Sequence, residues 1–234
     1  MSNNFFKFKQ FTIYQDKSAM KVCTDACVFG ATLPLMSNIY ALDIGAGTGL
    51  LSLMFAQKNN TSFVDSIEIE KNAFEQAKQN IDESILGERI NIVNADIKTF
   101  ESKNKYQIIF CNPPFYANDL KSVDKQRNIA MHSALLSYDD LLKAVEDLID
   151  NTGIFGVLLP FGAEKVFIDK ANLYGLYVKE ITRLNQTENH PFFRSIIYFT
   201  HKSGNIIEKE IIIKIKQEYS SEFKFLLKDY YLNL

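Results

Sequence analysis

The sequence predicts an α/β fold with a doubly wound, mostly parallel sheet and an antiparallel last strand. Short apolar runs alternate with segments whose apolar residues recur at helical spacing, and this alternation is typical of parallel strands joined by helices. The first run, 39–44, passes directly into the glycine-rich turn 45–49 and then into a helical pattern. Two runs near the end, 177–184 and 195–201, flank a polar turn and therefore predict an antiparallel pair.

The elements follow one another in a regular order. Helical patterns begin at residue 50, after strand 39–44, and at residue 73, after strand 63–70. Further strands are expected at 90–93, 106–111 and 154–159, with helices over 138–149 and up to residue 170. A strand and then a helix are expected in 206–234. We therefore divide the chain into an N-terminal segment (1–37), a central domain (38–202) and a C-terminal extension (203–234) packed on it.

Composition and charge narrow the possible classes of protein. A chain of 234 residues with 47% hydrophobic content can bury a full core. The net charge of -2 argues against indiscriminate nucleic-acid binding, although residues 1–21 and 98–127 each carry an excess of basic side chains. No stretch of about 18 apolar residues and no signal-peptide pattern is present, so we expect a cytoplasmic protein without membrane contact.

The three cysteines, Cys23, Cys27 and Cys111, predict neither a disulfide framework nor a metal site. Their number is odd, and none stands in a Cys-x-x-Cys pair. We therefore expect reduced, mostly buried thiols and no bound metal. The sequence leaves the oligomeric state open and favours a monomer.

A glycine turn predicts a nucleotide-like cofactor, together with three acids: Asp43, Glu68 and Asp96. A dinucleotide fingerprint would need glycine at position 50, where Leu50 stands. The spacing of Gly45, Gly47 and Gly49 instead resembles the first motif of S-adenosylmethionine-dependent methyltransferases, in which the cofactor approaches the bare backbone. The alternative is a turn needed only for tight packing of a strand on a helix.

Each acid lies at the end of a predicted strand. Asp43 is placed to face the amino acid part of the cofactor, and Glu68 can accept both hydroxyls of a ribose. Glu70 is the second choice for the ribose and suits a helix N-terminus. Asp96 either accepts a hydrogen bond from the adenine amine or caps the segment 97–100.

The run Asn112-Pro113-Pro114-Phe115 follows the apolar strand 106–111 and suits methyl transfer to a planar amino group. The lone pair of such a nitrogen is delocalised, so it is a weak nucleophile. The side-chain oxygen of Asn112 and the carbonyl of Pro113 can both accept from one NH2 group and hold it in place. Phe115 offers a flat face for a base. The alternative is a pair of prolines that merely ends a strand.

Together these motifs resemble the class I amino-methyltransferases with an Asn-Pro-Pro-aromatic motif, which have a Rossmann-like fold. Within them the chain is similar to the bacterial tRNA1(Val) adenine-37 N6-methyltransferases, most specifically in the N-terminal runs 8–11 and 20–25. The resemblance implies S-adenosylmethionine as cofactor and tRNA as partner. It also implies that Lys21, Thr24 and Asp25 lie over the cofactor, so that the segment 1–37 covers this site.

The residues after Asn112 and Pro113 are expected to bind the substrate. Phe115 and Met131 stand where related sequences usually carry Tyr and Arg, so the resemblance implies stacking without a phenol hydrogen bond at 115 and a weaker phosphate contact at 131. Tyr116 could supply that hydrogen bond. We expect a mobile lid over 116–129, and we assign substrate contacts to four side chains: Pro114, Tyr116, Lys121 and Arg127.

Three other functions remain open from the residues alone. A glutamine N5-methyltransferase acting on a protein such as a release factor meets the same chemical problem, but such enzymes carry a sizeable helical domain before the glycine turn, and 42 residues precede Asp43 here. A DNA adenine methyltransferase would need an added recognition region. A non-catalytic protein that binds RNA or the cofactor could share the fold, but an intact 112–115 motif argues against it.

Overall fold

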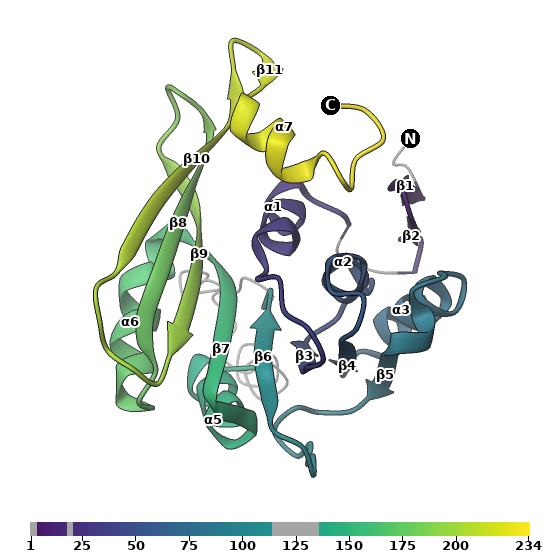
Figure 1. The fold of residues 1–234 in the computed structure, drawn as a ribbon, viewed down its shortest axis with the longest axis vertical. Helices are drawn as coiled ribbons and strands as arrows, with labels where there is room; N and C mark the ends of the chain where they lie inside the picture. Colours follow the sequence, from purple (N-terminus) through teal and green to yellow (C-terminus); the bar gives the residue numbers. More distant parts are fainter. Residues whose placement is uncertain (1–3, 18–20, 114–135) are drawn as a thin grey trace, which may run out of the picture.

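The computed structural model describes residues 4–17, 21–113 and 136–234. In these ranges one large sheet runs through the molecule (Figure 1), with the strand order β11-β10-β8-β9-β7-β6-β3-β4-β5. Its strands in chain order are β3 (Tyr40–Ile44), β4 (Phe63–Glu68), β5 (Ile90–Asn94), β6 (Tyr106–Cys111), β7 (Ile149–Pro160), β8 (Tyr177–Thr187), β9 (Phe192–Thr200), β10 (Ile207–Ile215) and β11 (Glu218–Tyr219).

The pairing of the strands confirms the predicted fold class. β3 pairs in parallel with both β4 and β6, and the sheet continues in parallel to β5 on one side and β7 on the other. The chain order therefore reverses next to β3, which is what a doubly wound sheet requires. β9 is antiparallel to both β7 and β8, as expected for the pair near the end.

The sheet extends beyond the predicted antiparallel strand. β10 joins the free side of β8 in parallel, and the short β11 pairs antiparallel with the end of β10. The expected strand and helix in 206–234 are present as β10 and α7. The tail thus contributes a strand to the sheet itself. Sequence periodicity shows that a segment is a strand, but it does not show which strand it pairs with, and here the paired residues lie some 27 positions apart, as in Ile207 beside Glu180.

Helices cover both faces of the sheet. The bounds are α1 (Thr24–Thr32), α2 (Leu50–Lys58), α3 (Lys71–Asp82), α5 (Tyr138–Leu148), α6 (Glu164–Leu173) and α7 (Ser221–Leu227). One apolar cluster joins the first three and α7 to one face, and a second joins α5 and α6 to the other (Figure 1). Both clusters are built from alternate residues of the same strands, such as Phe110 on one side and Ile109 on the other.

Helix capping follows the local sequence. The Glu70 carboxylate accepts hydrogen bonds from the backbone N–H groups of Asn72 and Ala73 at the start of α3, which confirms its interpretation as a helix N-terminal charge. Ser137 and Asp140 form a capping box at the start of α5. Such contacts satisfy N–H groups that have no partner inside the helix.

The two ends of the described chain lie beside each other (Figure 1). A small hairpin, β1 (Phe5–Lys7) and β2 (Thr12–Tyr14), was not predicted, because three-residue strands leave almost no periodic signal. Phe8 forms an isolated antiparallel bridge with Tyr231, and the Lys9 N–H donates to the Tyr230 carbonyl at 2.8 Å. The hairpin is therefore held by the C-terminal residues as well as by its own pairing.

Candidate active site

The carboxyl ends of the parallel strands bring the predicted site residues to one edge of the sheet. Ile44, the last residue of β3, is level with Ile67 of β4 and Cys111 of β6. Glu68 is level with Asn94 of β5. The glycine turn, Glu68, the segment leading to Asp96, and Asn112 therefore all leave the sheet on the same side, where doubly wound folds bind ligands.

Gly45 and Gly47 leave space for a ligand, whereas Gly49 serves packing. All three have positive φ angles, of 75°, 58° and 79°, which suit glycine. A Cβ added at Gly45 would have no atom within 4 Å, and one at Gly47 would meet only the Gly45 carbonyl at 4.0 Å. A Cβ at Gly49 would lie 3.6 Å from Ala77 of α3. The first two glycines thus fit a cofactor that lies against the backbone, and the third fits the packing alternative.

Glu68 is tied to the glycine turn. Its Oε2 accepts the N–H of Gly47 at 2.8 Å, and its Oε1 accepts the N–H of Glu70 at 2.9 Å. The side chain is buried, at 8% exposure. Each carboxylate oxygen has two acceptor positions, so both oxygens can still accept a hydroxyl. The backbone holds this carboxylate in one orientation at the end of β4.

Asp43 is fully buried behind the turn. Its Oδ2 accepts the hydroxyl of Ser52 at 2.6 Å, and the Ser52 and Ser66 hydroxyls are 2.7 Å apart. Its Oδ1 is buried and has no hydrogen-bond partner among the described residues. Burial, helped by the nearby Glu68 carboxylate and opposed by the hydrogen bonds from Ser52, raises the pKa of Asp43 to about 7. Sequence reasoning did not single out either serine, since neither belongs to a motif.

Asp96 makes the contact expected of a cap. Its Oδ1 accepts the N–H of Lys98 at 3.0 Å, and its Oδ2 lies 3.5 Å from the Lys98 ammonium. The side chain keeps 31% of its surface exposed. The capping interpretation is therefore satisfied locally, and the exposed part of the side chain leaves room for a second partner.

Asn112 and Pro113 follow β6 at the centre of this edge. The Oδ1 atom of Asn112 is buried and has no hydrogen-bond partner among the described residues. A buried acceptor without a partner is costly, so this oxygen is placed for a donor that is not part of the described chain. The third predicted catalytic residue, Phe115, lies outside the described residues, as do the expected lid, Met131 and the predicted substrate contacts Pro114, Tyr116, Lys121 and Arg127.

The N-terminal candidates Lys21, Thr24 and Asp25 lie at and before the start of α1. Lys21 is exposed and Thr24 is half-buried, whereas the Asp25 side chain is only 8% exposed. Asp25 Oδ2 accepts a hydrogen bond from Arg194 Nε at 2.7 Å, which joins α1 to the first residues of β9.

Sequence reasoning missed Arg194. An arginine within the apolar run 192–200 was the available signal, because a charge on a buried strand needs a partner.

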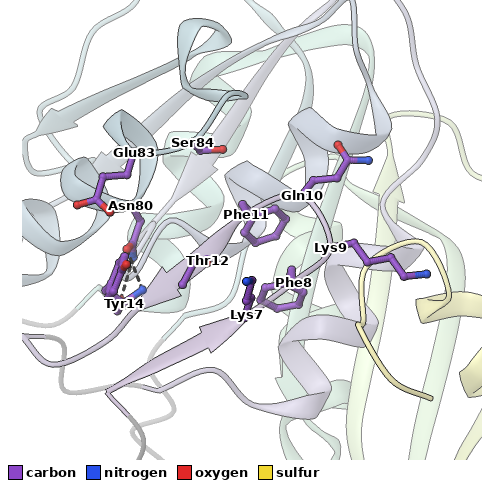
Figure 2. A pocket seen from close by; sticks show the side chains of 10 residues that line it. All are labelled: Lys7, Phe8, Lys9, Gln10, Phe11, Thr12, Tyr14, Asn80, Glu83 and Ser84. Atoms are coloured by element: carbon purple, nitrogen blue, oxygen red, sulfur yellow. Dashed lines mark hydrogen bonds between the residues drawn. The ribbon is translucent and has the colours of Figure 1, made fainter.

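The cavity beside the N-terminal hairpin does not involve the predicted site residues. A cavity of about 300 Å³ lies between the hairpin and the end of α3 (Figure 2), and neither the glycine turn nor Glu68, Asp96 or Asn112 lines it. Within the described ranges, no group of three or more His, Cys, Asp or Glu side chains could hold a metal ion. In the same part of the chain, no helix is both long enough and apolar enough to span a membrane.

The fold and this site define a class I S-adenosylmethionine-dependent methyltransferase. A solved structure described as a predicted O-methyltransferase from Agrobacterium tumefaciens superposes with a TM-score of 0.68 at 15% identity, covering 90% of this chain and 100% of that chain. A glycopeptide N-methyltransferase solved with S-adenosyl-L-homocysteine gives a TM-score of 0.58 at 13% identity, covering 80% and 90%. At these identities the likeness concerns the fold.

Sequence relatives narrow the class further. The profile of the methyltransferase small domain family matches residues 19–138. Curated relatives named tRNA1(Val) (adenine(37)-N6)-methyltransferase are 40% identical in Bacteroides fragilis, over the whole of both chains, and 37% identical in Flavobacterium psychrophilum, over 98% of this chain and all of the relative. The chain belongs to the tRNA1(Val) (adenine(37)-N6)-methyltransferase family.

Proposed function

We propose that the protein transfers a methyl group from S-adenosylmethionine to N6 of adenine 37 in tRNA1(Val). The observation that carries this proposal is the buried Asn112 Oδ1, which has no hydrogen-bond partner among the described residues and lies at the sheet edge where the glycine turn and Glu68 converge. The names of the full-length relatives support adenine in tRNA as the substrate.

Asn112 and Pro113 hold the attacking nitrogen. Bound S-adenosylmethionine supplies an electrophilic methyl group on its sulfonium sulfur. The Asn112 Oδ1 and the Pro113 carbonyl each accept one hydrogen of the exocyclic NH2, which turns its lone pair out of the plane of the base towards that methyl. Neither an amide nor a peptide carbonyl takes up a proton at neutral pH. The two residues therefore orient the nitrogen, and the proton released after transfer passes to solvent. Phe115 supports the base by stacking.

The remaining site residues hold the cofactor. Gly45 and Gly47 allow its methionine part to lie against the backbone, and Asp43 stands behind this part. The Glu68 carboxylate, fixed by Gly47 and Glu70, accepts the ribose hydroxyls. Asp96 accepts a hydrogen bond from the adenine amine while it also caps the segment after it.

The remaining parts of the chain recognise the substrate and close the site. The segment 1–37, with Lys21, Thr24 and Asp25, covers the cofactor held by the domain 38–202, and the extension 203–234 adds β10, β11 and α7 to that domain. Pro114, Tyr116, Lys121 and Arg127 contact the tRNA. As a tRNA-modifying enzyme, the protein acts in the cytoplasm, as a monomer.

One experiment tests both the substrate and the atom that is methylated. The protein is incubated with labelled S-adenosylmethionine and separate pools of tRNA, ribosomal RNA, DNA and release factor, and each labelled product is digested to nucleosides or amino acids. We expect N6-methyladenosine from the tRNA pool. Label in N5-methylglutamine would contradict the proposal and favour a protein substrate, and label in DNA would contradict it equally.

A further inference from the structure

We infer that Phe161 and Phe192 form a stacking platform for the nucleotide next to the target adenine. This inference rests on the proposed function, because it assigns a second RNA contact to the same edge of the sheet. Phe161 directly follows β7 and opens the short 3-10 helix η2 (Phe161–Ala163), and Phe192 is the first residue of β9.

The register of the sheet places this pair at the same end of the sheet as Asn112. Cys111 of β6 is level with Val157 of β7, so Asn112 leaves the sheet three residues before β7 itself ends at Pro160. Pro160 is in turn level with Arg194 of β9. Neighbouring strands are about 4.8 Å apart, and each strand residue rises about 3.3 Å. Phe161 is one strand away from Asn112 and three residues farther along, and Phe192 is two strands away and about four residues farther, so their backbones lie roughly 11 to 16 Å from Asn112. This distance suits a base that neighbours a target adenine taken out of the stack.

The two rings form an accessible aromatic surface. Their centroids are 5.3 Å apart at an interplanar angle of 51°, and Phe161 keeps 39% of its surface exposed. Phe192 is half-buried. Two planar faces inclined to one another can hold one flat ring by stacking on the first and edge contact with the second. Every nucleobase has such a face, and stacking on aromatic side chains requires no particular sequence.

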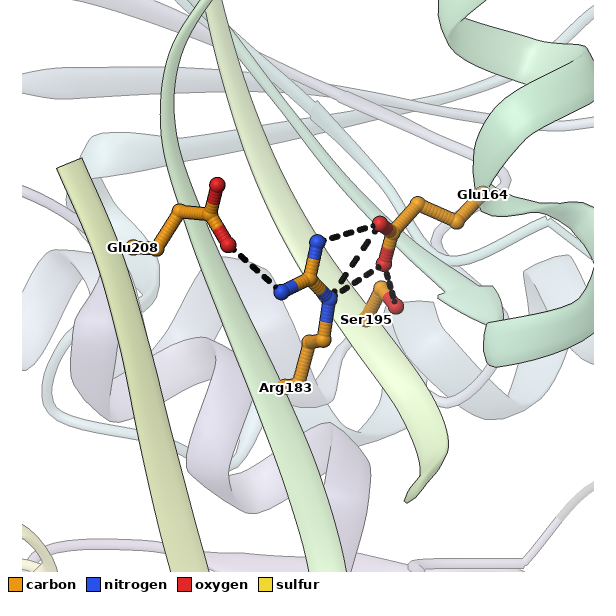
Figure 3. Close-up of polar contacts among 4 residues, drawn as sticks. All are labelled: Glu164, Arg183, Ser195 and Glu208. Carbon is orange, nitrogen blue, oxygen red and sulfur yellow. Dashed lines mark hydrogen bonds and ion pairs between the residues drawn. The ribbon is translucent and has the colours of Figure 1, made fainter. Parts of the chain in front are cut away.

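A polar network behind the platform keeps it in place. The Arg183 guanidinium lies 6.0 Å from the centre of the Phe192 ring. Figure 3 shows that Arg183 is itself held by Glu164, through its Nε and Nη2 atoms, and by Glu208 through Nη1 at 2.6 Å. Ser195 donates to the same Glu164 carboxylate at 2.5 Å.

This network joins four consecutive elements of the fold. It connects the start of α6, β8, β9 and β10, and the Arg183 and Glu164 side chains are only 20% and 12% exposed. A surface held in this way loses little conformational entropy when it binds a ligand. The pair is therefore presented on a rigid support at the same end of the sheet as Asn112, and this position favours a nucleotide of the RNA substrate as its occupant.

The test measures methyl transfer to an anticodon stem-loop RNA by the full-length protein. We expect Phe161→Ala and Phe192→Ala to raise KM for the RNA roughly tenfold, because stacking on an aromatic side chain is worth about 1 to 3 kcal/mol per base. Phe161→Tyr keeps the planar face and should keep a low KM. Phe161→Leu keeps an apolar surface without that face and should behave like Phe161→Ala. The dissociation constant for S-adenosylmethionine should stay unchanged in all four variants.

Phe63→Ala is the matched control. Phe63 is 49% exposed and stacks with Tyr40 at 5.9 Å, but both residues stand at the amino ends of their strands, on the opposite edge of the sheet. This variant should keep the wild-type KM for RNA. As a direct readout of stacking, 2-aminopurine next to the target adenine should be quenched by the wild-type protein and much less by Phe161→Ala.

Two results would overturn the inference. If Phe161→Ala and Phe192→Ala keep the KM of Phe63→Ala, no base stacks on the pair. If Phe161→Leu keeps the wild-type KM for RNA, an apolar surface without a planar face is sufficient. The contact is then not base stacking and would suit a protein partner equally well. Both results require a wild-type protein that methylates the RNA. A wild-type protein that transfers no methyl group to any RNA would instead contradict the proposed function itself.

Discussion

The carboxylate of Glu68 accepts the backbone N–H of Gly47 at 2.8 Å, which joins the end of β4 to the turn that follows β3. The second carboxylate oxygen is fixed by the N–H of Glu70. The acid that can bind a ribose and the turn that leaves space for a cofactor are therefore one structural unit. A change in either residue is expected to move the other.

Glu68→Gln is expected to weaken S-adenosylmethionine binding about 10- to 100-fold. The amide has a single acceptor oxygen, so its NH2 group must face either a backbone N–H or the ribose. Hydrogen bonds to charged groups contribute about 1.5 to 3 kcal/mol each, which corresponds to this loss of affinity. Isothermal titration calorimetry on the folded variant measures it. Unchanged affinity would remove Glu68 from the cofactor site.

Glu70→Gln is the matched control for that measurement. Glu70 lies two residues away and caps α3 through Asn72 and Ala73. A weakened cap lowers the free energy of unfolding by about 1 kcal/mol, while the affinity for the cofactor should stay within about twofold, less than 0.5 kcal/mol. A large loss of affinity in this variant would assign the ribose contact to Glu70.

Gly45→Ala and Gly49→Ala are expected to separate a cofactor contact from a packing contact. Both glycines have positive φ angles, so either alanine costs roughly 1 to 2 kcal/mol of stability. The Cβ at residue 45 would project into open space, whereas the Cβ at residue 49 would meet Ala77 and Ile81 at 3.6 Å. Calorimetry should show lost cofactor affinity in Gly45→Ala and near-normal affinity in folded Gly49→Ala. The reverse order would contradict the proposed orientation of the turn.

The buried Asp43 predicts a stability that depends on pH. Burial raises its pKa from 3.8 to about 7 in the folded protein, so the folded state holds a proton that the unfolded state has released. This contribution is fully present below pH 3.8 and is lost as the pH rises through about 7.

Asp43→Asn removes this titration and keeps an acceptor for Ser52. The free energy of unfolding of the variant minus that of the wild type should therefore increase between pH 4 and pH 7, by up to about 1.4 kcal/mol per pH unit. Chemical denaturation at several pH values measures the difference. A difference that stays constant over this range would show that Asp43 ionises normally in the folded protein.

Arg194→Ala is expected to lower the free energy of unfolding by about 2 to 3 kcal/mol. It leaves the Asp25 carboxylate, 8% exposed, without its partner at 2.7 Å. The loss stays below the range of about 3 to 5 kcal/mol for fully buried pairs, because the Arg194 side chain is 26% exposed.

Lys165→Ala breaks an ion pair with Asp169 whose side chains are 85% and 61% exposed and should have no measurable effect. Equal effects of the two substitutions in denaturant titrations would contradict a structural role for the Asp25–Arg194 pair.

The central sheet could be predicted from the sequence because its strands are buried runs followed by helices with an apolar stripe. The order around β3 and the antiparallel β9 follow from general rules of α/β folds. The pairing of β10 with β8 could not be predicted, since β10 carries charges such as Glu208 and Lys209 and resembles an exposed strand. Its partner is selected by tertiary packing of Ile211 and Ile213 against the first core cluster.

The positions of the candidate site residues could be predicted where these residues belong to a sequence motif. They could not be predicted where they depend on contacts between distant segments. The turn 45–49, Glu68 and Asn112 stand at strand ends, and the sheet brings them to one edge as expected. The Asp25–Arg194 pair joins residues 169 positions apart, a distance that sequence periodicity does not reach. The two oxygens of Glu68 are bound by backbone N–H groups, which leave no signature in the sequence.

The proposed methyl transfer depends most on Asn112, which holds the attacking nitrogen. The most direct measurement is the single-turnover rate of methyl transfer to tRNA by Asn112→Ala, with cofactor and RNA both saturating. We predict a rate at least about 100-fold below wild type, with the dissociation constants of both ligands within about twofold. Asn91→Ala, whose amide bonds Asp65, should keep the wild-type rate. Turnover by Asn112→Ala at or near the wild-type rate would contradict this role of Asn112.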